Sequence, residues 1–386
     1  MGDNKFYKVF AVLGGALLVA GVALYFLDPG GGTSKEYLLT YLYGWLFWAC
    51  LTFGCFGLSL LHHMAKGHWG YPVMRLLEAG GGPLMLLVTF VLFIPILVNV
   101  ETVYPWVGMT VEEIGPKAEW YLTTTFWQVR TVAYFAIFIF MSYRNRMWQR
   151  KLDDTGDVKY LRWMTNWSSG FFPIYFLLMN FAITDWAQSM LPHWFSTMYG
   201  IWFIVMQALG AIGLVAIIIG WQANKPPFDK IVTPGLTKDI GNLMLVLTML
   251  WAYFSFSQYL IIYSGDLPEQ TQYFITRTNG GFEYLGPVLI TLGFFVPFLM
   301  LISPRMKREP RLLMVAGLWL FGVRFLDMHY GVAPLWETGV MDGIVGKLGA
   351  LAMFGGVWFF LFGRGLTSAP LFVKDQPHLK EAADHA

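Results

Sequence analysis

The sequence predicts an all-α integral membrane protein with ten transmembrane helices, arranged as two tandem four-helix bundles plus two peripheral helices. Three observations predict this fold class. Hydrophobic residues make up 56% of the 386 residues and charged residues only 13%, against about 25% in a typical soluble domain. Ten apolar segments each approach the roughly 20 residues that a membrane span needs. The basic residues fall almost entirely in alternate connections between these segments.

The first apolar segment, residues 9–27, follows Lys5 and Lys8 and ends at Asp28-Pro29-Gly30. It is longer than the apolar region of a signal peptide and has no small-residue cleavage motif behind it, so we expect an uncleaved first span. The nine later spans are predicted at residues 38–61, 83–100, 122–142, 170–190, 198–221, 240–263, 281–302, 311–328 and 345–363.

The distribution of basic residues supports this count and gives an orientation. Of the 26 Lys and Arg residues, twenty fall in the N-terminus, the even-numbered connections and the C-terminal tail. Only Lys35, Lys117 and Arg277 fall in the odd-numbered connections, and three others lie within spans. Because Lys and Arg are enriched in cytoplasmic loops, we expect both termini to be cytoplasmic. The net charge of +2 gives no indication of nucleic-acid binding.

An internal repeat is visible in the spacing of polar residues. Asp185 is followed by Pro192 and Trp194, and Asp327 by Pro334 and Trp336 at the same spacing. A second pair of segments aligns when Gly82 is matched with Gly241, so that Leu-Met-Leu and Thr coincide. We therefore expect a peripheral first helix (1–37), two four-helix units in the same orientation (38–197 and 198–344), and a last helix with a cytoplasmic tail (345–386). Chance similarity among leucine-rich helices is the alternative.

Ionisable and amide side chains inside the spans are candidate functional residues, because such groups cost several kcal/mol in a bilayer unless they are paired or hydrated. Several helices carry them toward the outer surface. A proton path through this cluster would use Asp185, His193, Arg324 and Asp327. A weaker quinone pocket at the same depth would use Gln188, Gln258, Arg130 and His329.

Structural explanations compete for each of these residues. Arg324 and Asp327 are spaced i, i+3 and could form an intrahelical ion pair, while Asp185 could lie at the interface and His193 in water. Near the inner surface, His62, His63 and Glu78 are expected in a solvated loop, with a proton inlet as the less favoured alternative. Trp186 and Trp194 are expected in an outer aromatic belt.

No redox metal site is expected. The only cysteines, Cys50 and Cys55, are too few for an iron–sulfur cluster or a cysteine-based zinc site. None of the seven His residues lies in the middle of a span, so the helices cannot supply paired axial ligands for a haem. We therefore expect no covalently bound cofactor, a quinone or quinol as the candidate ligand, and partner proteins to carry any electrons.

The stretch Asp185-Trp186, Ser189, Pro192-His193-Trp194, Ser196-Thr197 and Gly200 resembles the NrfD-like family of polysulfide reductase membrane subunits. Within it, the likeness is to the F subunits of bacterial alternative complex III; it covers nearly the whole chain, with Arg324, Asp327 and His329 in support. The resemblance implies a respiratory quinol:electron-acceptor oxidoreductase in the membrane lipid. It also implies an NrfD-like sister subunit and iron–sulfur and c-haem subunits as partners. A secondary transporter with parallel repeats and a purely structural membrane anchor are the rival interpretations.

Overall fold

The computed structural model describes residues 6–27, 33–67 and 69–367. Within these ranges every regular element is a helix, and nine helical segments are long and apolar enough to cross a membrane. The expectation of an all-α membrane protein is therefore confirmed. The expected cytoplasmic tail from residue 368 onward, Lys5 and the turn at 28–32 lie outside the described residues.

Seven of the nine candidate spans consist of one α-helix, which in the case of α17 is extended by the short 3-10 helix η4 (Ala333–Leu335). They are α1 (Phe6–Leu27), α2 (Ser34–Ala65), α9 (Thr124–Thr155), α11 (Thr197–Gln222), α12 (Pro234–Gly265), α17 (Pro310–Val332) and α18 (Ile344–Thr367). The other two are composite. One joins α3 (Met74–Gly81), α4 (Pro83–Val91) and α5 (Ile94–Val98), and the other joins α14 (Phe282–Leu289), the π-helix η3 (Ile290–Phe295) and α15 (Val296–Ile302).

The remaining predicted span, 170–190, corresponds to α10 (Lys159–Trp186) and is not among the nine. The helix is 28 residues long, but Asn180, Thr184 and Asp185 lower the hydropathy of its apolar part. It ends before residue 190, so that Gln188 lies in the short 3-10 helix η1 (Gln188–Met190) rather than one turn along the same helix.

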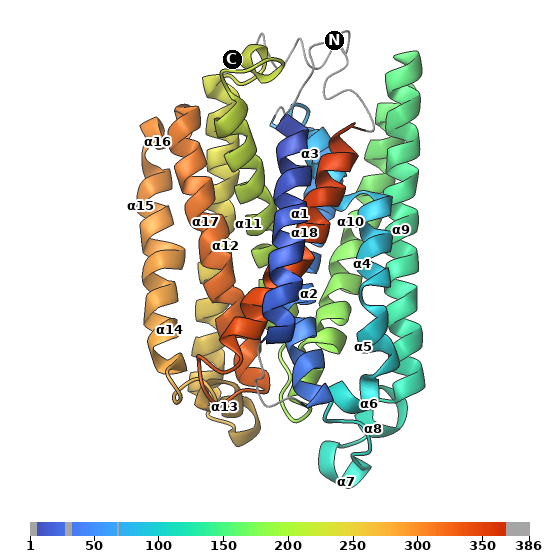
Figure 1. The fold of residues 1–386 in the computed structure, drawn as a ribbon, viewed down its shortest axis with the longest axis vertical. Helices are drawn as coiled ribbons and strands as arrows, with labels where there is room; N and C mark the ends of the chain where they lie inside the picture. The colour runs from blue at the N-terminus through green and yellow to red at the C-terminus, as the bar shows by residue number, and fades with distance from the viewer. Residues whose placement is uncertain (1–5, 28–32, 68, 368–386) are drawn as a thin grey trace.

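The centre of the molecule is formed by α2 and α11. In the most apolar stretch of α2, 94% of the residues are buried, and in that of α11 89% are buried, whereas the figure for α1 is 22%. Helices α10, α17 and α18 also contact α2 or α11, while α1 contacts chiefly α18 (Figure 1). Large apolar side chains such as Val12 and Phe26 on α1 are exposed, as expected for helices that face lipid.

The short helices lie at the two ends of the bundle. At one end are α6 (Val100–Val103), α7 (Val111–Ile114), α8 (Lys117–Trp120) and α13 (Pro268–Ile275) (Figure 1). At the other, here called the basic end, lie α3, α16 (Pro304–Arg308) and the turn between α9 and α10 (Figure 1). The first residue of α1, Phe6, and the last residue of α18, Thr367, also lie at the basic end (Figure 1).

Two features differ from the sequence-based expectations. The charged stretch between residues 142 and 170 is helical, since α9 continues to Thr155 and α10 begins at Lys159. The expected outer aromatic belt is wrong for Trp186 and Trp194, whose side chains are 0% and 2% exposed. Trp186 instead fills the space between α2 and α9, where its ring stacks on Phe135 and Phe53.

Candidate functional site

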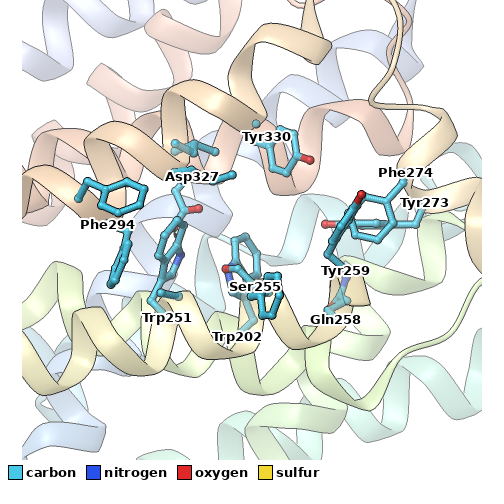
Figure 2. A pocket seen from close by; sticks show the side chains of 16 residues that line it. Trp202, Trp251, Ser255, Gln258, Tyr259, Tyr273, Phe274, Phe294, Asp327 and Tyr330 are labelled. Carbon is cyan, nitrogen blue, oxygen red and sulfur yellow. Dashed lines mark hydrogen bonds between the residues drawn. The ribbon is translucent and has the colours of Figure 1, made fainter. Parts of the chain in front are cut away.

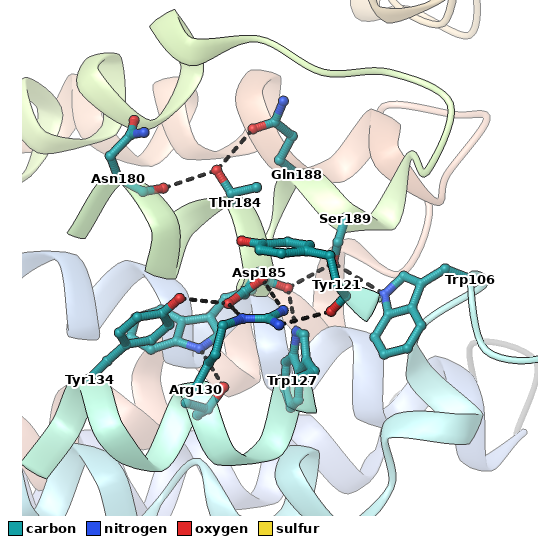
Figure 3. A network of polar contacts seen from close by, with 12 residues as sticks. Trp106, Tyr121, Trp127, Arg130, Tyr134, Asn180, Thr184, Asp185, Gln188 and Ser189 are labelled. Atoms are coloured by element: carbon teal, nitrogen blue, oxygen red, sulfur yellow. Dashed lines mark hydrogen bonds and ion pairs between the residues drawn. The ribbon is translucent and has the colours of Figure 1, made fainter. Parts of the chain in front are cut away.

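Asp185, near the end of α10, lies in a fully bonded ion pair. Its two carboxylate oxygens accept hydrogen bonds from Nε and Nη2 of Arg130 on α9, at 2.9 and 2.8 Å. The hydroxyl of Tyr134, one turn along α9, donates a third bond at 2.9 Å (Figure 3). The Asp185 side chain is 0% exposed, so this carboxylate is buried but compensated.

Aromatic rings complete the surroundings of this pair. The Arg130 guanidinium lies 3.9 Å from the centre of the Tyr121 ring and 4.4 Å from that of Phe126. Trp127 donates to the backbone carbonyl of Asp185, which also accepts a bond from Ser189 (Figure 3). The structure therefore brings Arg130 and Asp185 together, in an ion pair that joins α9 to α10.

Asp327 on α17 has fewer partners. Its Oδ2 accepts hydrogen bonds from Arg324, one turn earlier on the same helix, and from Nε1 of Trp251 on α12 at 2.8 Å. Its Oδ1 and the Nη2 of Arg324 have no hydrogen-bond partner in the described part of the chain. Both side chains are almost completely buried, at 1% and 3% exposed. The intrahelical ion pair considered from the i, i+3 spacing is thus present.

Asp327 also borders a cavity of about 340 Å³, here called the Asp327 pocket. Figure 2 shows the pocket between Trp251, Ser255 and Gln258 of α12 on one side and Asp327 and Tyr330 of α17 on the other. Its further walls are aromatic and aliphatic and come from α11, α13, α14 and η3: Trp202, Tyr273, Phe274, Leu289, Ile290, Phe294 and Phe295. The Ser255 hydroxyl is buried without a hydrogen-bond partner among the described residues.

Local backbone features shape this pocket. Trp251, Ser255 and Gln258 are spaced i, i+4 and i+7, so one face of α12 lines it. The π-helix η3 turns Ile290, Phe294 and Phe295 toward the pocket, and such π segments often occur at functional sites. Phe256, Ile290 and Phe295 are more than half exposed, so the pocket opens on the lipid-facing side.

Arg277 holds one wall of the pocket in place. Its guanidinium donates to the backbone carbonyls of Tyr330 and Gly331 on α17, both at 3.0 Å, and lies 3.5 Å from the centre of the Tyr273 ring. Arg277 is 3% exposed. It therefore connects the two tyrosines that form this side of the pocket.

The other predicted residues lie elsewhere. His193 is exposed in the turn before α11, and the contacts of Asp185 do not include it. Gln188 accepts a bond from Thr184 and does not line the Asp327 pocket (Figure 3). His329 contacts the carbonyl of Val340 through Nε2 and packs between Tyr43 and Phe282. Of the four residues expected for a quinone pocket, only Gln258 lines the cavity.

A buried pair near His329 joins the connection that precedes α18 to the first turn of that helix. Glu337 is paired with Lys347, which also donates to the Asp342 carbonyl at 2.7 Å. Burial raises the pKa of Glu337 above its ordinary value, and the adjacent ammonium group counteracts this shift.

The expected solvated loop at His62 and His63 is wrong. Both side chains are buried in the last turn of α2, at 1% and 8% exposed, and the His62 ring packs against Tyr71. Nearby, Glu78 pairs with Arg75 and Arg146 and joins α3 to α9. Hydropathy suggested a loop here because it does not register the ion pairs that Glu78 forms with Arg75 within α3 and with Arg146 on α9.

Comparison with known proteins identifies no relative. No protein-family model matches the chain, and no curated protein matches it at a significant level. In the described ranges, no three His, Cys, Asp or Glu side chains are grouped so that they could hold a metal ion. The functional assignment therefore depends on the geometry of the two aspartate centres and on the resemblance seen in the sequence.

Proposed function

We propose that this chain is an integral subunit of a quinol:electron-acceptor oxidoreductase of the alternative complex III type, and that its Asp327 pocket binds a quinone or quinol head group. The observation that carries the proposal is a buried carboxylate with one unpartnered oxygen, in a residue that borders a mainly apolar cavity open to the lipid-facing side. Ligand sites of this kind combine apolar walls with a few polar groups that fix orientation.

The residues present fit a quinone ring. The roughly planar walls contributed by Trp251, Tyr273 and Tyr330 suit an aromatic ring, and Oδ1 of Asp327 can accept a hydrogen bond from a quinol hydroxyl. The Ser255 hydroxyl is a second group able to contact a ring oxygen. An apolar tail would leave through the side lined by Phe256 and Ile290.

The internal repeat supports a site in the second half only. Matching Gly82 with Gly241 pairs Phe93 with Ala252 and Ile96 with Ser255. Phe93 and Ile96 are both 0% exposed in the first half, whereas Ala252 and Ser255 line the pocket in the second. Larger side chains thus fill the first half where the second is hollow.

The chemical role that we assign to this chain is proton exchange and orientation. A quinol bound there would supply two electrons and two protons, and the electrons would pass to iron–sulfur and c-haem partner subunits. Asp327 is placed to accept a proton, while Arg324 and Trp251 hold its other oxygen in position. Proton translocation through the bundle would use the same carboxylate, so it is an extension of this function rather than a separate one.

The proposed architecture has ten spans, in which α10 is added to the nine candidate spans as the fifth along the chain. At 28 residues, α10 is about 42 Å long, which exceeds the thickness of a bilayer core. It lies against α2 and α9, and α17 in the second half lies against α11 and α14. These matching contacts support two tandem units at residues 38–197 and 198–344. The proposal further places both termini on the cytoplasmic side of a bacterial inner membrane, because of the distribution of basic residues, and an NrfD-like sister subunit beside the chain, because of the sequence resemblance.

The pocket is tested by filling it with the side chains found in the first half. We expect Ala252→Phe and Ser255→Ile each to weaken binding of a short-chain quinone analogue by more than tenfold in a titration of the purified protein. Ala136→Phe, the same change at an exposed position of α9, is the control and should bind as the unmodified chain does. Unchanged binding in Ala252→Phe would exclude the pocket as the quinone site.

A further inference from the structure

The α9–α10 hairpin has an aromatic cluster of its own at the basic end. Trp148, Leu152 and Met164 are buried together there, separate from the main core, with Tyr160 and Trp167 packed around them. In Figure 1, α9 runs the full height of the right-hand side and reaches this end. The hairpin therefore places aromatic rings where the helices leave the apolar zone.

Arg144 lies on this cluster without an acidic partner. Its guanidinium carbon is 4.6 Å from the centre of the Trp148 ring and 5.8 Å from that of Trp167. No carboxylate lies within 4.0 Å of it in the described ranges, unlike the nearby Arg75 and Arg146, which pair with Glu78. A half-buried guanidinium held only by aromatic faces keeps its hydrogen-bond donors free for an anion.

The side chains are ordered along the hairpin from apolar to cationic. One turn toward the bundle from Arg144, Phe140 is 51% exposed and its ring packs edge-on against Trp167. About 10 Å further toward the basic end, at a rise of 1.5 Å per residue, Lys151 and Lys159 lie near the Tyr160 ring. A phospholipid has the same order of acyl chain, phosphate and headgroup.

We propose that the surface of the α9–α10 hairpin around Arg144 binds the phosphate of an anionic phospholipid from the membrane leaflet at the basic end. Four cations of the hairpin, Arg144, Arg150, Lys151 and Arg162, have no salt bridge among the described residues, against one such carboxylate, Asp154, so the hairpin carries a net positive charge. The exposed rings of Phe140, Tyr143 and Trp163 favour a lipid over a soluble anion, because they need an apolar contact.

The test measures lipid binding to the purified chain by native mass spectrometry, using short-chain phosphatidylglycerol, phosphatidylcholine and inorganic phosphate as probes. We expect phosphatidylglycerol to bind in preference to phosphatidylcholine, and Arg144→Gln to weaken this binding about tenfold. Arg364→Gln is the matched control, since this exposed cation in the last turn of α18 lies outside the hairpin and has no aromatic contact in the described structure, and its effect should be under twofold.

Three outcomes would overturn the proposal: equal effects of the two substitutions, equal binding of the two lipids, or displacement of phosphatidylglycerol by inorganic phosphate at matched concentration. Arg144→Lys keeps the charge but loses the planar stacking, so an intermediate affinity supports the geometry. It also provides a folded variant if Arg144→Gln is recovered in poor yield. None of these results depends on whether a quinone binds the Asp327 pocket.

Discussion

At the scale of single residues, the two repeated aspartates have different environments. Asp185 receives three side-chain hydrogen bonds, two of them from a guanidinium on another helix. Asp327 receives two on one oxygen, and its other oxygen has no partner among the described residues. We therefore assign a structural role to Asp185 and the reactive role to Asp327, while the predicted part of Asp185 in a proton path stays a prediction.

Replacing Arg130 tests the structural role. In Arg130→Gln the buried Asp185 carboxylate loses its charged partner, and breaking a buried pair in this way costs about 3–5 kcal/mol. We expect a clear fall in the midpoint of thermal unfolding in detergent. Lys159→Gln removes an exposed ion pair with Asp157 and should change the midpoint little. Equal midpoints for the two variants would contradict the structural role.

The sequence identified the two aspartates, Asp185 and Asp327, more readily than it identified the side chains that contact them from other helices. The i, i+3 spacing of Arg324 and Asp327 was sufficient for an intrahelical pair, because one helix fixes both side chains. Arg130 and Asp185 are 55 residues apart, so their contact depends on helix packing. The i, i+4, i+7 face of Trp251, Ser255 and Gln258 was visible in the sequence, but Tyr273 and Arg277 come from a connection with no periodic signal.

At the scale of helices, α1 is held against α18 by close contacts at small residues. A Cβ added at Gly356 would lie 2.4 Å from the backbone nitrogen of Leu18, and one at Gly14 would lie 2.7 Å from the Gly356 carbonyl oxygen. Small residues allow transmembrane helices to approach closely, and the rest of α1 faces lipid.

We expect Gly356→Leu to separate α1 from α18. Overpacking of this kind costs about 1–3 kcal/mol, so the unfolding midpoint should fall by several degrees, and protease should cleave the connection after α1 faster. Gly15→Leu on α1 is the control, because nothing lies within 4 Å of a Cβ added there. A midpoint for Gly356→Leu equal to that of Gly15→Leu would show that this packing is unimportant.

Helix boundaries were less predictable than helix existence. The apolar segments located the helices, but hydropathy stopped at the charged residues near 142 and 170, whereas α9 and α10 continue through them. The extension is stabilised by side-chain packing of Trp148 and Met164 between the two helices, which no single-segment signal contains. The break between α3 and α4 follows from Gly82 and Pro83, which were visible in the sequence.

At the scale of the whole molecule, the two halves differ at the Asp327 pocket, because its equivalent positions in the first half, Phe93 and Ile96, are filled by buried side chains. Transporters with repeated halves place matched broken helices around a central site. Here the composite span of α3, α4 and α5 is interrupted, while α12, its counterpart in the proposed repeat, is continuous. This asymmetry favours a subunit with one ligand pocket over an alternating-access transporter.

The most direct test of this asymmetry is photolabelling of the purified chain with an azido-quinone, followed by mass spectrometry of the labelled peptides. The expected result is labelling confined to peptides that contain Trp251–Tyr259 of α12 or Tyr330 of α17, and its loss in Ala252→Phe. Labelling around Arg130 and Asp185 instead, or labelling that Ala252→Phe leaves unchanged, would contradict a single quinone pocket in the second half.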